Sequence, residues 1–248
     1  MNKEGWSALA GARGVMALVV VGAHAHSFTR DEAVRTFARM SAFAAVVCFL
    51  VISGYSIAAS LDREPRGFYG RRALRIMPVY ILGIVAAMLC TMPFGGVQVT
   101  LFGYRHEMPN LATAVANLFF LQGFTAKLLA TNGVVWTLSI EVACYLIAPA
   151  LRKLSLGAVV AIGAASLGVF VAAGALGAPH YSEMLYGGGL ASLGWCWILG
   201  FLCWRIRDNG ARALTVIGVC TVAFSLNGQH LYGLWPLSVV ITGVAFWG

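Results

Sequence analysis

Charged residues are scarce in this chain of 248 residues, because Asp, Glu, Lys and Arg together make up only 10% of it. Hydrophobic residues make up 60%, and the mean hydropathy of +0.81 lies well outside the range of soluble globular domains. So little charge excludes a fold with a fully solvated surface, and the recurring apolar runs leave no room for a separate aqueous core. We therefore expect a single integral-membrane domain over residues 1–248.

The chain also lacks the patterns that hold metal ions or bind nucleic acid. Its six cysteines lie inside apolar runs, without a CxxC pair or a Cys/His spacing suited to zinc, so no metal site is expected. The formal net charge of +8 is not gathered in a basic, aromatic-bearing soluble module, which excludes nucleic acid as a partner. We interpret this charge mainly as a membrane orientation signal.

Apolar runs of about twenty residues, the length that crosses a bilayer, recur along the chain. They predict an all-α, polytopic transmembrane bundle with about eight spans, near 7–28, 41–60, 73–92, 134–151, 156–177, 185–204, 211–227 and 231–247. The segment 110–126 is shorter and more polar. It either crosses the bilayer or forms a short re-entrant or amphipathic piece.

The distribution of basic residues decides between these two topologies. If 110–126 does not cross, twelve of the 17 Lys and Arg lie on the side of the N-terminus, whereas a crossing segment would lower that number to eight. Cytoplasmic loops carry the excess of Lys and Arg in membrane proteins. The re-entrant topology is therefore favoured, with both termini in the cytoplasm.

Two ionisable residues share one face of the first apolar run. Arg13 and His24 are eleven residues apart, which places them about 20° apart around a helix and about 16 Å apart along it. Ionisable groups are unfavourable at membrane depth, so this helix is expected to line a polar cavity. A transmembrane active site is the first hypothesis.

Four sequence patterns occur in order between residues 13 and 149. They are the Arg13/His24 pair with ten residues between; CFLVISGY, with Ser53 and Tyr55; RRALRIMPVY, with Arg72 and Arg75; and WTLSIEVACYLIAP, with Trp136, Glu141 and Tyr145. Together these patterns resemble the integral-membrane acyltransferase 3 family. Cys48 and Thr137 stand where the family has Phe and Ser.

The resemblance implies transfer of an acyl group, often acetyl, from cytoplasmic acyl-CoA to a hydroxyl group of a carbohydrate or glycolipid. Acyl-CoA is then a co-substrate, and no permanently bound cofactor is implied. The expected partners are membrane lipids and the carbohydrate or lipid-linked acceptor, and the expected location is a bacterial inner membrane. Relatives usually have about ten spans, so a C-terminally shortened, inactive homologue is one alternative.

Arginines near the cytoplasmic face are the candidates for binding coenzyme A, because its pyrophosphate and 3′-phosphate suit bidentate donors. The residues that fall there are Arg13, Arg71, Arg72 and Arg75. The spacing of the last three predicts a basic cluster at the start of a helix. The alternative is that these arginines only obey the positive-inside rule and bind lipid headgroups.

His24 and Glu141 are the candidate catalytic residues. Counted from the ends of their spans, they are expected at similar depth, where Glu141 would stabilise the imidazolium as His24 takes a proton from the acceptor hydroxyl. In a variant of this mechanism, His24 carries the acyl group covalently. The residues expected to line the substrate path are Ser53, Tyr55, Trp136 and Tyr145.

Tyr145 follows Glu141 by four residues and is expected to hold it by a hydrogen bond. Structural roles are the alternatives: Ser53 for close helix packing, Trp136 for an aromatic belt and His24 as a buried helix contact. A transporter or flippase is a further alternative, because intramembrane His, Glu and Arg also build proton relays. No inverted repeat is visible in the sequence to favour it.

Overall fold

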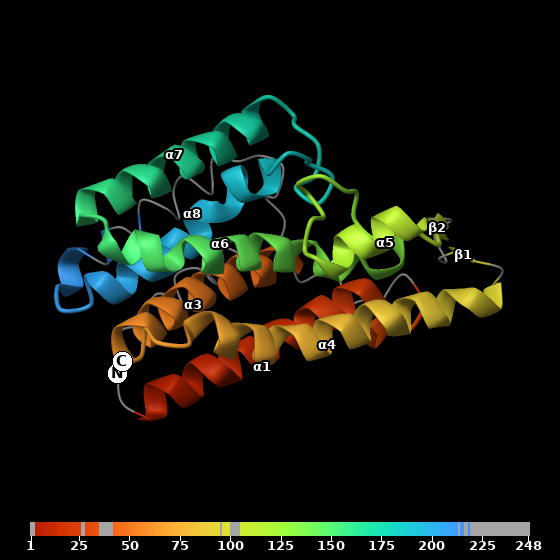
Figure 1. The fold of residues 1–248 in the computed structure, drawn as a ribbon, viewed down its shortest axis with the longest axis horizontal. Coiled ribbons are helices and arrows are strands. Elements are labelled where there is room, and N and C mark those ends of the chain that lie inside the picture. Colours follow the sequence, from red (N-terminus) through yellow and green to blue (C-terminus); the bar gives the residue numbers. More distant parts are fainter. Residues whose placement is uncertain are drawn as a thin grey trace.

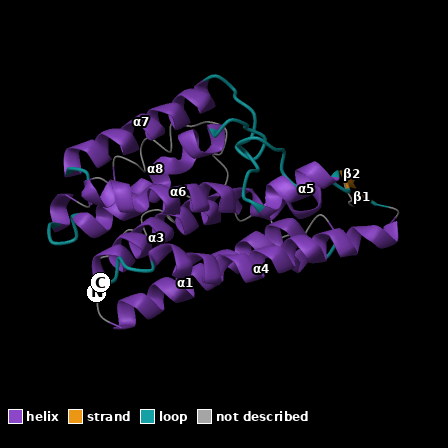
Figure 2. Cartoon of the chain, in the orientation of Figure 1, coloured by secondary structure: helices purple, strands orange, loops and turns teal. Residues whose placement is uncertain are grey.

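The computed structural model describes residues 3–25, 28–34, 42–94, 96–99, 105–212, 214–215 and 218. The helices are α1 (Lys3–Ala25), α3 (Ala42–Arg63), α4 (Phe68–Thr91), α5 (Leu111–Leu118), α6 (Trp136–Lys153), α7 (Leu156–Ala175) and α8 (Gly188–Arg205). There are also two 3-10 turns, η2 (Met92–Phe94) and η3 (Ala130–Val135), and an antiparallel hairpin of β1 (Val97–Val99) and β2 (Arg105–Glu107). The expected all-α bundle is confirmed, with this hairpin as a small addition (Figure 1; Figure 2).

Five helices are long and apolar enough to cross a membrane: Gly5–Ala25, Ala42–Arg63, Phe68–Thr91, Asn132–Lys153 and Leu156–Ala175. They match the first five expected spans in order. The sixth expected span coincides with α8, whose 18 residues are mostly buried against other helices. The span expected at 231–247 lies outside the described residues, as does most of 211–227, so the total of eight stays a prediction.

The segment 110–126 does not run through the bundle. α5 has eight residues, and at about 1.5 Å per residue it is far shorter than a hydrocarbon core of about 30 Å. α4 ends and α6 begins at the same end of the bundle, and the hairpin and α5 lie there between them (Figure 1). This arrangement agrees with the expected re-entrant or amphipathic segment.

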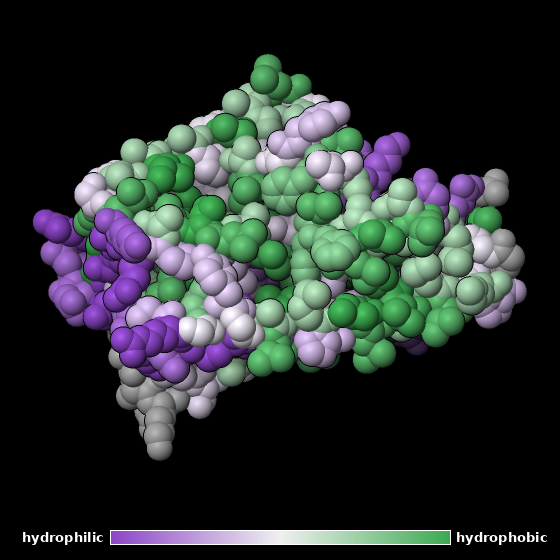
Figure 3. Space-filling model, viewed as in Figure 1, coloured by the Kyte–Doolittle hydropathy of each residue, from purple (hydrophilic) through white to green (hydrophobic). Residues whose placement is uncertain are grey.

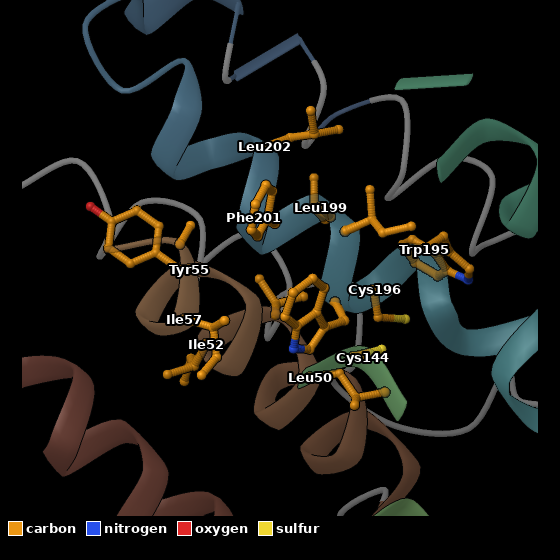
Figure 4. Packing of buried hydrophobic residues seen from close by; sticks show 14 of the residues in the cluster. Leu50, Ile52, Tyr55, Ile57, Cys144, Trp195, Cys196, Leu199, Phe201 and Leu202 are labelled. Atoms are coloured by element: carbon orange, nitrogen blue, oxygen red, sulfur yellow. The ribbon is translucent and has the colours of Figure 1, made fainter. Parts of the chain in front are cut away.

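α3 and α8 form the centre of the bundle, with α7 packed on α8 and α1 packed on α3. Fourteen of the 18 residues of α8 are buried, which explains why this helix is apolar on every side. Large side chains from both helices interlock around the crossing, among them Ile52, Leu199 and Phe201 (Figure 4). Small residues at the crossing itself allow the two backbones to approach closely.

One end of the bundle carries most of the arginines, and we call it the basic end. α1 and α4 begin there, and α3, α6 and α8 end there, with basic residues in their last turns. Hydrophilic side chains gather at this end on the left of Figure 3, while the flank of the bundle is hydrophobic. Exposed apolar residues on α4, such as Leu74 and Leu82, are what a lipid-facing surface requires.

Asp62 ties three helices together at the basic end. Its Oδ1 accepts a hydrogen bond from Arg152 Nε at 3.1 Å, and its Oδ2 accepts one from Trp204 Nε1 at 2.7 Å. These contacts join the last turns of α3, α6 and α8. They fix the position of the neighbouring Arg63, which faces the site described next.

Candidate active site

Glu141 lies between α6 and α3, in the middle of the bundle. Its Oε1 accepts a hydrogen bond from Ser53 Oγ at 2.6 Å and another from Tyr145 Oη at 2.5 Å. The two hydroxyl oxygens are 3.1 Å apart. Ser53 and Tyr145 are almost fully buried, so both hydroxyls have exchanged water for the carboxylate. The other oxygen, Oε2, accepts no hydrogen bond from the described residues.

His24 lies in the last turn of α1, away from Glu141. Its Nδ1 is 2.8 Å from the carbonyl oxygen of Val20, one turn earlier in the same helix. Val20 packs against Ala45 on α3, whereas Ser53 is eight residues further along α3, about 12 Å at 1.5 Å per residue. His24 and Glu141 are therefore not in hydrogen-bond contact, and their depths differ.

The difference in depth has a structural cause. Glu141 is five residues from the start of α6, yet its partner Ser53 is eleven residues from the start of α3. α6 begins deeper because η3 and the residues before it fold in at that end of the bundle. Counting residues from span ends does not detect such an offset.

A pocket of about 350 Å³ opens at the basic end between α1, α3 and α4, and we call it the basic pocket. Four arginines line it: Arg13, Arg63, Arg72 and Arg75. Of the residues predicted to bind coenzyme A, three therefore meet here. Arg63 was missed, although its spacing from Ser56 and Ser60 places all three on one face of α3.

Two residues that line the basic pocket have a buried donor without an acceptor among the described residues. Arg72 Nη2 donates to Ser60 Oγ at 2.9 Å, but Arg72 Nε is buried without a hydrogen-bond partner among the described residues. The same holds for Trp6 Nε1, and the Trp6 ring lies 4.8 Å from the Arg63 guanidinium. Buried donors without acceptors are unfavourable. The pocket is thus suited to a ligand that supplies several negatively charged oxygens.

Arg71, the fourth predicted residue, has a different environment. Its guanidinium donates to the carbonyl oxygens of Glu64 and Arg66, and it forms an ion pair with the Glu64 carboxylate at 3.4 Å. Among the residues that the structure describes, Glu64 is the one acidic residue that lines the basic pocket, and Arg71 already compensates its charge. Arg71 therefore stabilises the turn between α3 and α4.

The remaining predicted residues are spread over three places. Tyr55 is buried in the core, with its ring 6.1 Å from Trp6 and 5.3 Å from Trp204. Trp136 lines a small pocket at the end opposite the basic end, together with the buried Gln122. Tyr145 donates a hydrogen bond to Glu141, and its side chain also lines an apolar pocket between α4 and α6.

A family model described as an acyltransferase domain matches residues 6–248, nearly the whole chain. The chain belongs to the acyltransferase 3 family. Nodulation protein 10 of Rhizobium leguminosarum bv. viciae is 29% identical over 143 residues, which cover 52% of this chain and 39% of that relative. The chain thus matches less than half the length of this curated relative, and no solved structure is significantly similar to it.

In this acyltransferase 3 chain, residues from all four sequence patterns lie on neighbouring helices. Arg13 and Arg72 line the basic pocket, and both lie within electrostatic range of Tyr145. Tyr145 and Ser53 in turn hold Glu141. The patterns therefore bring polar side chains of four helices together, both at the basic end and in the middle of the bundle.

Proposed function

We propose that this protein is a membrane O-acyltransferase. It moves an acyl group, acetyl in the simplest case, from cytoplasmic acyl-CoA to a hydroxyl group of a carbohydrate or lipid-linked acceptor in the cell envelope. The basic end faces the cytoplasm in this proposal, because cytoplasmic loops carry the excess of Lys and Arg. The proposed location is a bacterial inner membrane. The observation that carries the proposal is the basic pocket with its four arginines, next to the half-buried carboxylate of Glu141 and its two buried hydroxyl partners.

Coenzyme A binds with its phosphates in the basic pocket. Arg13, Arg63, Arg72 and Arg75 compensate the phosphate charge, and charge-assisted hydrogen bonds to guanidinium groups are the strong ones. The pantetheine arm extends along α3 past Ser56 toward Glu141, whose Oε2 accepts from an amide N–H of the arm.

His24 performs the chemistry at the far end of α1. Because a carbonyl oxygen can only accept, Nδ1 donates its hydrogen to Val20 O, which leaves Nε2 with a lone pair. As a general base, Nε2 takes the proton of the acceptor hydroxyl while the oxygen attacks the thioester carbonyl and CoA leaves as the thiol. As an acyl carrier, Nε2 attacks the thioester first, and the acceptor hydroxyl then displaces the imidazole.

The offset between His24 and Glu141 gives the two residues separate tasks. Glu141 lies near the donor site and holds the donor, whereas His24 lies nearer the end at which the acceptor arrives. Glu141 does not have to orient the imidazole, because the backbone of Val20 does so. The pantetheine arm extends outward along α1 between these two points, so the acyl group stays bound to CoA until the thioester reaches His24.

Release of CoA by the purified chain in nanodiscs tests this function. Acetyl-CoA and an extract of envelope glycans are supplied, and CoA and acetylated glycan are measured by mass spectrometry. Wild type releases more than one CoA per protein molecule only when acceptor is present. His24→Ala abolishes this turnover, and His180→Gln, at an exposed histidine in the α7–α8 loop, retains it. Movement of glycan across the nanodisc or a liposome without acetylation would instead establish a transporter.

A further inference from the structure

α4 is attached to the bundle at its two ends and near its middle, and it leaves a groove beside α6 between the first and the middle attachment. Only four of its 24 residues are buried: Phe68, Tyr80, Ile84 and Thr91. Between these attachments lies an apolar pocket of about 270 Å³, lined on α4 by Ala73 and Met77 and on α6 by Val142 and Leu146. A packed protein does not leave such a space empty, because its walls would lose their dispersion contacts. In a bilayer a hydrocarbon chain fills it.

Both ends of this apolar groove are defined by aromatic rings. At one end is Phe120, whose backbone has a φ of 59°, a conformation that is unfavourable for a bulky residue. Its ring stacks on Tyr80 at 4.1 Å and is thereby held in place. At the other end is Tyr69, which donates a hydrogen bond to the Leu146 carbonyl at 3.0 Å. Tyr69 and Met77 are about 12 Å apart along α4, which is long enough for part of a lipid chain.

A second pocket, of about 290 Å³, continues from Tyr69 toward the basic end. Its lining includes Arg152 and Lys153, in the last turn of α6. The nearby carboxylates are already compensated, because Asp62 pairs with Arg152 and Glu64 pairs with Arg71. Lys153 forms no ion pair with any described residue. This end of the groove is therefore positively charged and open to an anionic group.

We propose that the groove between α4 and α6 binds one anionic phospholipid of the membrane. Its headgroup phosphate lies at Arg152 and Lys153, and one acyl chain runs past Tyr69 toward Phe120. Basic pockets beside transmembrane helices bind anionic headgroups in this way. The orientation also fits, because lipids of the leaflet at the basic end already point their headgroups outward and their chains toward the bundle centre.

The same groove touches the proposed active site. Arg72 lines both the apolar groove and the basic pocket, and Tyr145 lines the groove while it holds Glu141. A bound lipid therefore packs against Arg72 and Tyr145, which also belong to the proposed active site. The lipid site itself does not depend on the proposed function, because it rests on the shape and charge of the groove alone.

Lipid titration of the purified chain in detergent micelles, followed by native mass spectrometry, tests the site. Phosphatidylglycerol and phosphatidylcholine with identical acyl chains are compared. Wild type retains one phosphatidylglycerol about tenfold more tightly than phosphatidylcholine. Lys153→Gln lowers the affinity for phosphatidylglycerol about fivefold and leaves phosphatidylcholine unchanged, as expected for one lysine near the surface. Ala73→Trp fills the groove and lowers the affinity for both lipids at least tenfold.

Two matched variants serve as controls. Lys127→Gln removes a positive charge at the opposite end, and Leu82→Trp adds an indole to an exposed position of α4 outside the groove. Both retain lipid as wild type does. If Ala73→Trp lowers the melting temperature without lipid, Leu146→Trp on the other wall makes the same test. Equal retention of the two lipids by wild type, or normal retention by the groove-filling variants, would overturn the proposal.

Discussion

Ser53 and Glu141, 88 residues apart in the chain, share a hydrogen bond of 2.6 Å in the middle of the bundle. The bond crosses from α3 to α6, and Tyr145 donates to the same carboxylate oxygen. A carboxylate in an apolar setting is stable only when hydrogen bonds replace its hydration. These two hydroxyl groups are what allow the chain to keep Glu141 at this depth.

Removing either hydroxyl group should lower acyl transfer without unfolding the protein. A hydrogen bond to a charged group contributes about 1.5–3 kcal/mol, so we expect Tyr145→Phe and Ser53→Ala each to lower kcat about tenfold or more. Because both donate to one oxygen, the double variant should lose less than the product of the single losses. The measurement is steady-state kinetics with acetyl-CoA, and Tyr186→Phe, at an exposed loop position, is the control. Multiplicative losses would contradict the shared oxygen.

Two adjacent arginines should respond differently to the same substitution. Arg72 lines the basic pocket, so Arg72→Gln should raise the KM for acyl-CoA about tenfold or more, which is the loss of one charge-assisted contact to phosphate. Arg71 closes the α3–α4 turn, so Arg71→Gln should leave KM within about twofold and lower the melting temperature slightly. The test is a comparison of KM and melting temperature for the two variants. A larger KM change for Arg71→Gln would exclude this division of roles.

Patterns along single helices were sufficient to predict the elements but not the contacts between them. Apolar runs located α1, α3, α4, α6 and α7, because a helix in lipid must satisfy its own backbone and present apolar side chains. Four-residue spacing likewise predicted the contact of Tyr145 with Glu141, since both lie on one helix face. Such features depend on residues that are close in the chain.

Contacts between helices depend on their relative depth, which spacing does not encode. The pairing of His24 with Glu141 assumed that α1 and α6 reach the same level, but η3 and the segment before it displace the start of α6. The division of labour between Arg71 and Arg72 was equally hidden, because it is set by the turn that precedes α4. The role of His24 in catalysis stays a prediction.

Asp62 should contribute more to stability than its position near the surface implies. Asp62→Ala removes the acceptors of Arg152 and Trp204 at once, whereas Arg152→Gln removes only a half-exposed ion pair. We expect Asp62→Ala to lower the free energy of unfolding by about 1–3 kcal/mol, because it leaves the indole N–H of the buried Trp204 without a partner. Thermal unfolding in micelles measures both variants, with Asp208→Ala as the exposed control. Equal effects of Asp62→Ala and Arg152→Gln would show that the indole contact contributes nothing.

Reciprocal glycine contacts should make the α3–α8 crossing intolerant of a single methyl group. A Cβ at Gly54 would overlap the Trp197 carbonyl, and a Cβ at Gly200 would overlap the Val51 carbonyl, so in both cases the obstacle is rigid backbone. We expect Gly54→Ala and Gly200→Ala each to lower the free energy of unfolding by about 1–3 kcal/mol or more, as overpacking does.

Gly168 on α7 supplies the matched control for this crossing, because a Cβ there would meet nothing within 4 Å. Gly168→Ala should be neutral or stabilising by about 0.5–1 kcal/mol, the usual gain of alanine over glycine inside a helix. Denaturant unfolding of the three variants in the same micelles gives the comparison. If Gly54→Ala and Gly200→Ala were as stable as Gly168→Ala, α3 and α8 would have to lie further apart than they do in the structure. The backbone of α3 that positions Ser53 would then not be fixed by α8.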